Sequence, residues 1–126
     1  MKKIIHTDKA PSAIGAYSQA VEANNMLFVS GQIPLDPATM KLVEGGIKEQ
    51  TERVLKNIQI ILEAAGYNKN DVVKATILLS DISNFSEVNQ IYSKVFADNP
   101  PARATYEVAR LPLGSMLEIE AIAVKS

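Results

Sequence analysis

The sequence predicts an α+β domain in which two helices lie on one face of a mixed sheet of about five or six strands. Residues 47–65 and 85–96 have the apolar spacing of amphipathic helices, and β-prone runs precede, separate and follow them. The 126 residues, 47% of them hydrophobic, suffice for one hydrophobic core and contain no internal repeat or linker. We therefore expect a single domain over residues 1–126.

The first predicted strands, residues 17–21 and 26–30, form a hairpin. Asn24 and Asn25 between them suit the positive φ angles of a tight turn. A loop rich in glycine and proline follows and leads into helix 47–65, which a glycine is suited to end. One face of this helix carries its apolar side chains together with one threonine: Ile47, Thr51, Val54, Leu55, Ile58, Ile61, Leu62 and Ala65.

The middle of the chain is predicted to continue as strand, helix and strand. Residues 72–79 contain few polar side chains, which is typical of a central strand covered on both faces. Asn84 and Glu87 have the spacing of a cap for helix 85–96, and two prolines after it prevent its continuation. The next strand is expected around residues 105–109.

The last predicted strand, residues 117–124, brings acidic side chains close to the core. Because side chains alternate along a strand, Glu118 and Glu120 share one face with apolar residues. A carboxylate in such a place lies near an edge or has a partner, since burying an unpaired charge is costly. Arg103 is the nearest cation, and two prolines before it restrain its backbone. These residues suggest a site for a small anion with an acid–base group beside it.

Composition excludes several kinds of chemistry. The net charge is −1, from 13 basic and 14 acidic residues, and no run of like charge favours nucleic acid or a membrane surface. The absence of cysteine excludes disulfides and thiolate nucleophiles, and the acidic residues show no metal-ligand pattern. His6, the one histidine, lies near a terminus and gives a Ser-His-Asp triad little support. With no signal-peptide pattern and no apolar run of about 20 residues, we expect a cytoplasmic protein that needs no metal or cofactor.

The predicted helices leave one face of the sheet uncovered. The central and last strands nevertheless look apolar on both sides. Another copy of the chain is the simplest cover, and a closed symmetric ring is the expected assembly. Clefts between subunits would then supply the pocket that so small a domain lacks.

Each candidate site residue also has a structural interpretation. Arg103 suits bidentate binding of a carboxylate, but it also suits an ion pair with Glu107 or Glu120. Glu120 can equally be an ordinary half-exposed strand residue. Asn89 falls in an apolar helical stripe, where a polar group is more often a hydrogen-bonding core residue than a ligand contact. Tyr17 can serve in plain packing.

Several motifs together resemble the RidA (YjgF) family. The similarity runs from about residue 4 to residue 125, in the order and spacing of that family, and is carried by residues 13–20, 30–34, 88–92, 101–103, 107–112 and 119–123. The resemblance implies a chorismate-mutase-like α+β fold, a homotrimer, and active sites in the clefts between subunits. It also implies hydrolysis of reactive 2-imino acids, such as 2-iminobutanoate and 2-iminopropanoate, to 2-oxo acids and ammonia without a cofactor.

The resemblance also implies roles for individual residues. Arg103 would clamp the substrate carboxylate, and Glu120 would position or activate the attacking water, with Tyr17 as a second catalytic residue. The substrate-binding residues implied beside Arg103 are Ser30, Gly31, Asn89 and Thr105, the last through its main chain. Thr105 stands where the family commonly has cysteine, and Ala16 replaces a usual proline. Neither change removes a group that this chemistry needs.

The residues agree with imine hydrolysis but leave two other functions open. A 2-imino acid needs an anchor for its carboxylate, a water held against the imine carbon and a group that transfers protons. Arginine, glutamate and main-chain groups suffice for these tasks. A sensor or regulatory module that binds small carboxylates without turnover would use the same arginine. A translation-inhibiting endoribonuclease is the third possibility, and the lack of a basic stripe disfavours it.

Overall fold

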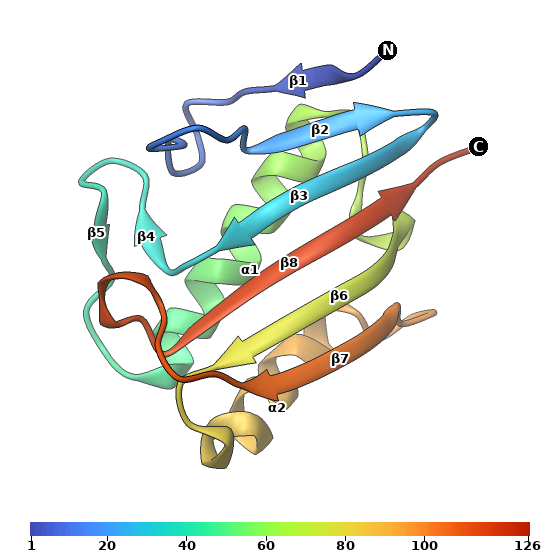
Figure 1. Ribbon diagram of the computed structural model, residues 1–126. Coiled ribbons are helices and arrows are strands. Elements are labelled where there is room, and N and C mark those ends of the chain that lie inside the picture. The colour runs from blue at the N-terminus through green and yellow to red at the C-terminus, as the bar shows by residue number, and fades with distance from the viewer.

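The computed structural model describes all 126 residues and has two helices on one face of a six-stranded sheet, so the predicted α+β architecture is confirmed (Figure 1). The strand order is β1 (Lys3–Ile5), β2 (Ala20–Ala23), β3 (Met26–Gln32), β8 (Leu117–Val124), β6 (Val72–Leu79) and β7 (Ala102–Glu107). Only β6 and β7 are parallel. A second sheet consists of β4 (Leu35–Asp36) and β5 (Lys41–Leu42).

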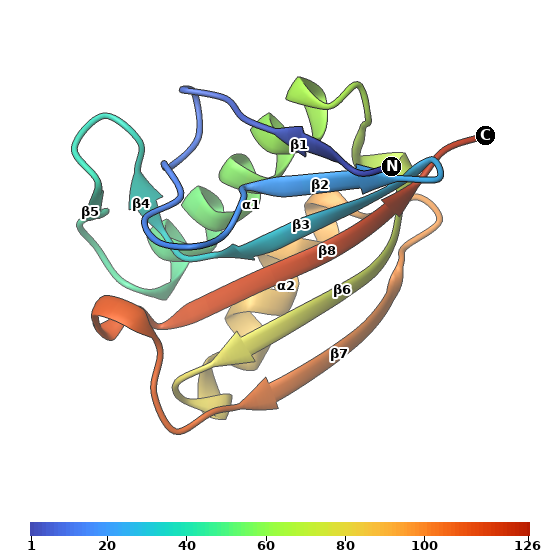
Figure 2. The same ribbon diagram turned by 45° about the horizontal axis from the view of Figure 1, so that its top comes forward.

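Both helices, α1 (Ile47–Ala64) and α2 (Phe85–Val95), lie behind the main sheet in the two views of Figures 1 and 2. The predicted apolar stripe of α1 is buried against the sheet from Ile47 to Leu62, whereas Ala65 caps the helix and is only partly buried. Each large aliphatic side chain buried this way contributes about 1.5–3 kcal/mol. Neither helix is long and apolar enough to cross a membrane.

The N-terminal hairpin forms as predicted, but its first strand is shorter. Asn24 and Asn25 take positive φ values of 52° and 60° in the turn. Strand β2 begins at Ala20, so the prediction that Tyr17 starts a strand was wrong. The buried Gln19 explains the difference, because its side chain binds main-chain groups of residues 7–11 and holds this segment as a loop. The short strand β1, which pairs with β2, was not predicted.

Helix α2 begins differently from the prediction. Asn84 makes no side-chain capping bond to it. A short 3₁₀ turn, Ile82–Asn84, precedes the helix, and Asp81 caps that turn by accepting a hydrogen bond of 2.9 Å from the Ser83 N–H. The chain is therefore already helical where α2 starts, and a cap at Asn84 is not needed.

The face of the sheet away from the helices, here called the open face, is exposed in a single chain. On β6, Ala75, Ile77 and Leu79 point to the helices and are buried, whereas Lys74 on the other side is exposed. One chain covers β6 on the helix side alone, as the count of two helices predicted, and its coverage on the other face by a second copy stays a prediction. Large hydrophobic side chains on the open face include Phe28, exposed by 43%, and Tyr106, exposed by 58%.

Candidate active site

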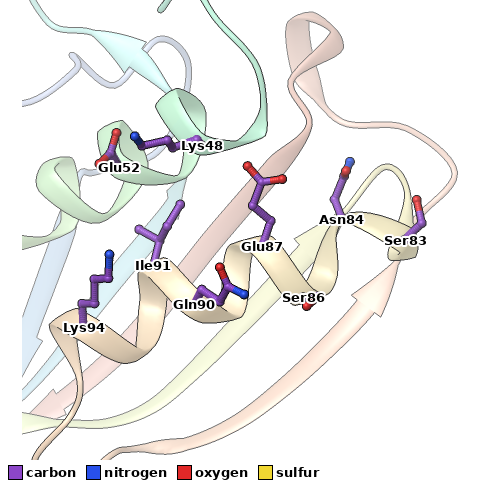
Figure 3. Close-up of a pocket in the computed structure, with 9 residues that line it drawn as sticks. All are labelled: Lys48, Glu52, Ser83, Asn84, Ser86, Glu87, Gln90, Ile91 and Lys94. Carbon is purple, nitrogen blue, oxygen red and sulfur yellow. The ribbon is translucent and has the colours of Figure 1, made fainter.

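A hollow of about 510 Å³ lies between α1 and α2 (Figure 3). The hollow is lined by Lys48 and Glu52 of α1 and by Glu87 and Lys94 of α2, so each helix contributes one basic and one acidic side chain. Ile91 is its one hydrophobic lining residue. The hollow contains none of the predicted site residues, and no charged side chain in it is buried.

Arg103 leaves the sheet on its helix-covered side. In the register of β7, β6 and β8 it is aligned with Ala75 and Ala121, which are both buried beneath the helices. Strand β7 begins at Ala102 rather than near the predicted residue 105, because β6 offers it a parallel partner from Lys74 onward. Arg103 thus belongs to a strand at the edge of the sheet, next to α2.

Three side chains of α2 contact the guanidinium of Arg103. Its Nη1 donates a hydrogen bond of 2.8 Å to Oδ1 of Asn89. Its Cζ lies 4.9 Å from the ring centroid of Tyr92 and 5.2 Å from that of Phe85. These four residues are called the arginine cluster below. Asn89 does form a hydrogen bond, but its partner is Arg103 at the exposed sheet edge and not a group in the core.

The alternative of a structural ion pair for Arg103 was wrong. The chain contains two ion pairs, His6 with Asp8 and Lys125 with Glu22, and neither involves Arg103. Glu107 instead accepts a hydrogen bond of 2.9 Å from the Ile82 N–H. The positive charge of Arg103 is therefore not neutralised within the chain.

Thr105 lies two residues along β7 from Arg103 and points to the same side of the sheet. The Val108 N–H donates to the Leu79 carbonyl of β6, so the alternation along β7 turns the main-chain groups of Thr105 away from β6. No other strand covers this edge. The main chain of Thr105 is thus free to bind a ligand or another strand, and its role in substrate binding stays a prediction.

A second group of predicted residues gathers at a bulge in β3. Val29 pairs with Ala121 and Gln32 with Ile119, so two residues of β3, Ser30 and Gly31, stand opposite the single residue between Ile119 and Ala121. The Ser30 hydroxyl donates a hydrogen bond of 2.6 Å to a main-chain carbonyl of the Tyr17 loop, at residue 18. The bulge thereby fixes the loop that carries Tyr17.

The carboxylate of Glu118 lies directly over Gly31. A Cβ atom at position 31 would stand 2.8 Å from Cδ of Glu118 and 3.1 Å from its Cγ, and closer still to Oε2. The backbone of Gly31 does not have a positive φ, so glycine is needed here for space and not for conformation. Glu118 is half-buried, and this burial, followed by the nearby charge of Glu120, raises the pKa of its carboxyl group.

Tyr17 and Gly31 line one small hollow together with Pro11 and Ile33. The Tyr17 side chain is exposed by 53%, and its hydroxyl accepts a long hydrogen bond of 3.4 Å from the Ile14 N–H. Tyr17, Ser30, Gly31 and Glu118 are called the carboxylate cluster below.

Glu120 shares a face of the sheet with Glu118, as the alternation predicted; this is the open face, and Glu120 is exposed on it. It is aligned with Thr76 and borders a shallow hollow with Lys74 and Phe28. The semi-buried carboxylate that the sequence suggested is therefore Glu118. Alternation placed both glutamates on one face, and the signal that separates them is Gly31 on the neighbouring strand.

The two clusters lie on opposite sides of the sheet. Arg103 points to the helix-covered side, whereas Glu118 points to the open face, with β6 between their strands. One chain thus does not bring the predicted anion anchor and the acid–base group together. No group of three or more metal-ligating side chains is found.

Comparison with known proteins gives this arrangement a family. A sequence model described as endoribonuclease L-PSP, which represents the YjgF/RidA proteins, matches residues 7–125. The chain belongs to the RidA family. A rat protein named 2-iminobutanoate/2-iminopropanoate deaminase is 54% identical over 125 residues, which cover 99% of this chain and 91% of the rat protein.

Solved structures of RidA-family proteins have the same fold. A crystal structure from Thermotoga maritima is 56% identical, covers 100% of this chain and 99% of its own, and has a TM-score of 0.98. Escherichia coli TdcF, solved with bound serine, is 41% identical at a TM-score of 0.94 and covers 98% of this chain and 99% of its own. The family and the fold class predicted from the motifs are both confirmed.

Proposed function

We propose that this chain hydrolyses 2-imino acids to 2-oxo acids and ammonia, at sites formed between the copies of a homotrimer. The observation that carries the proposal is the separation of two complementary clusters on opposite sides of the sheet. One offers a guanidinium with no ion-pair partner, and the other offers a half-buried carboxyl group with a raised pKa. A second copy can supply the cluster that each face lacks. The name of the rat relative supports the reaction.

In this proposal Arg103 binds the substrate carboxylate through two parallel hydrogen bonds. The carboxylate cluster of the neighbouring copy then faces the imine. Glu118, whose raised pKa favours the protonated form, donates its proton to the imine nitrogen and then accepts a proton from water. The water oxygen bonds to the imine carbon and gives a carbinolamine, with Glu118 protonated again. Glu118 then protonates the amino group, the C–N bond breaks as the C=O bond forms, and the hydroxyl proton returns to Glu118 as ammonia leaves. Tyr17 borders the reacting atoms, and Gly31 leaves room for the carboxylate.

The acid–base role thus goes to Glu118, and Glu120 is kept as a neighbour whose charge acts on it. The charge of Glu120 adds to the effect of burial in raising the pKa of Glu118, so Glu118 keeps its proton to a higher pH than an exposed glutamate does.

Two further observations support the proposal. The ligand of TdcF, serine, has a carboxylate and a nitrogen on the same carbon atom, as a 2-imino acid does. The open face exposes Ile4, Phe28, Tyr106 and Val124, whose apolar surface another copy would cover. Each copy has one helix-covered face and one open face, so identical contacts between unlike faces of successive copies would form a ring where the rotation between copies closes.

The test measures hydrolysis of 2-iminobutanoate, generated in the assay by an amino acid oxidase, together with the mass of the protein by light scattering. We expect acceleration by a trimer, and loss of acceleration in Arg103→Ala and Glu118→Gln at unchanged mass. Gln90→Ala is the matched control, because Gln90 is exposed in the groove of Figure 3 on the other side of α2.

Four results would count against the proposal or against its choice of acid–base residue. Saturable binding of 2-oxobutanoate without acceleration would identify a carboxylate sensor. Cleavage of RNA in place of imine hydrolysis would identify a ribonuclease, which the net charge of −1 disfavours. A stable, active monomer would show that one chain completes the site by another route. If Glu118→Gln is fully active while Glu120→Gln is not, the acid–base role belongs to Glu120.

A further inference from the structure

We propose that Asn89 is a positioning residue, which holds the guanidinium of Arg103 against an aromatic platform formed by Phe85 and Tyr92. This inference rests on the proposed function and explains how its anion anchor is prepared before a ligand arrives. It also changes the role of Asn89, from a residue that touches the substrate to one that acts through Arg103.

The three residues that hold the Arg103 guanidinium, called the holder below, come from one face of α2. Phe85, Asn89 and Tyr92 are spaced by four and three residues, so they lie above one another on the same side of the helix. All three contact Arg103: its Cζ lies 5.2 Å from the ring centroid of Phe85 and 4.9 Å from that of Tyr92, and its Nη1 lies 2.8 Å from Oδ1 of Asn89. Tyr92 is only 3% exposed, so this part of the platform is itself fixed in the core. A long and otherwise mobile side chain is thereby held in one place.

The holder leaves the binding edge of the guanidinium free. A guanidinium has five N–H donors, and the bond to Asn89 uses one hydrogen of Nη1. The edge formed by Nε and Nη2 makes no hydrogen bond within the chain, and this edge matches the two oxygens of a carboxylate. Orientation by Asn89 thus decides which edge the substrate meets.

The holder is also neutral. An amide oxygen and two aromatic faces attract a cation without cancelling its charge, whereas an aspartate at position 89 would form an ion pair with it. The full charge of Arg103 therefore remains for the anionic ligand. This explains why an arginine held so closely has no acidic partner.

The experiment measures how fast the guanidinium of Arg103 rotates, because a group held by a hydrogen bond rotates more slowly than a free one. The chain has three arginines, so the Nε and Nη signals in nitrogen-15 NMR spectra are assigned with the single variant Arg103→Lys. We expect slow rotation of the Arg103 guanidinium in the parent protein and fast rotation in Asn89→Ala. Arg53, which donates from Nε and Nη2 to Asn57 at 2.9 Å and 2.6 Å, is the internal reference and keeps its signals in both proteins.

The functional readout is the affinity for 2-oxobutanoate, measured with kcat and KM for 2-iminobutanoate. We expect Asn89→Ala to weaken binding and raise KM by about tenfold, with kcat at saturation changed by less than about threefold. Asn89→Asp should weaken binding further, because its carboxylate competes with the ligand for Arg103. Gln90→Ala, the matched loss of an amide from the same helix, should change none of these quantities.

Two outcomes overturn the inference: an unchanged rotation of Arg103 in Asn89→Ala, or an unchanged affinity for 2-oxobutanoate. Equal losses in Asn89→Asp and Asn89→Ala would show that the neutrality of the holder is irrelevant. The proposed function fails separately, if Arg103→Ala binds 2-oxobutanoate and turns over imine as well as the parent. Unchanged ligand affinity in Asn89→Ala overturns the inference alone, whereas unchanged affinity and turnover in Arg103→Ala overturn the proposed function.

Discussion

Replacing Gly31 with alanine should inactivate the protein with little effect on its folding. The added Cβ would stand 2.8 Å from Cδ of Glu118, whereas ordinary contacts begin at 3.4 Å. Because Gly31 does not have a positive φ, alanine fits the local backbone without strain. The atoms that must yield are the end of a flexible side chain, so the carboxylate moves and the strand does not.

The size of the effect follows from these distances. Cδ of Glu118 must retreat by at least 0.6 Å, the difference between 3.4 Å and 2.8 Å, and the closer Oε2 by more. A displacement of about 1 Å in a catalytic group costs roughly a hundredfold in rate. The cost in the free energy of unfolding should stay near 1 kcal/mol, the price of a less favoured side-chain rotamer. We therefore expect about a hundredfold loss of kcat/KM at nearly unchanged Tm.

The assay compares imine hydrolysis, thermal unfolding and mass for Gly31→Ala and for Gly46→Ala. Gly46 is the matched control, since a Cβ there meets nothing within 4 Å and its φ is −103°. Full activity in Gly31→Ala would refute the placement of Glu118 over this glycine as the catalytic arrangement. A large loss of stability in Gly31→Ala would show instead that the bulge cannot accept a side chain.

Two other predictions concern stability. Burial raises the pKa of Glu118 in the folded chain, so the stability linked to this group is present at acidic pH and is lost as the pH rises through the raised value. Glu118→Gln removes this penalty and should therefore raise the free energy of unfolding at pH 7. Urea titrations should show that this gain vanishes below the ordinary pKa of glutamate. The same variant loses the acid–base group, so its turnover should fall by about 10²–10⁴-fold. The same Tyr→Phe substitution should have opposite effects at two buried positions. The Tyr67 hydroxyl donates a 2.6 Å hydrogen bond to Glu22, and its loss should cost about 1 kcal/mol, whereas the Tyr92 hydroxyl has no partner and its removal should leave Tm equal or higher. A lower Tm for Tyr92→Phe would reveal an unrecognised partner.

The parts of the fold that were predicted are those in which periodicity is long enough to outweigh local exceptions. Helix α1 was found to within one residue because its apolar stripe extends over five turns, and β6 and β8 are runs of eight residues. Strands β1, β4 and β5 have only two or three residues, too few to show alternation. Tyr17 was misplaced because the side chain of Gln19 supplies hydrogen bonds that a strand would otherwise provide.

The candidate site was only partly predictable for a similar reason. Arg103 was identified from its prolines and its motif, but its side of the sheet depends on a register with β6 that no single strand reveals. Glu118 and Glu120 are equivalent in the alternation of β8. The bulge in β3, which places Gly31 beneath Glu118, distinguishes them, and it appears only when the two strands are paired.

The separation of the two clusters has a genetic consequence. A copy that has lost Arg103 keeps an intact carboxylate cluster, and a copy that has lost Glu118 keeps an intact arginine cluster. If the site is shared, equal amounts of Arg103→Ala and Glu118→Gln chains should form mixed rings in which about a quarter of the sites join two intact halves. Two alleles that are each inactive would then complement one another in the same cell, and neither would be fully recessive or fully dominant to the parent.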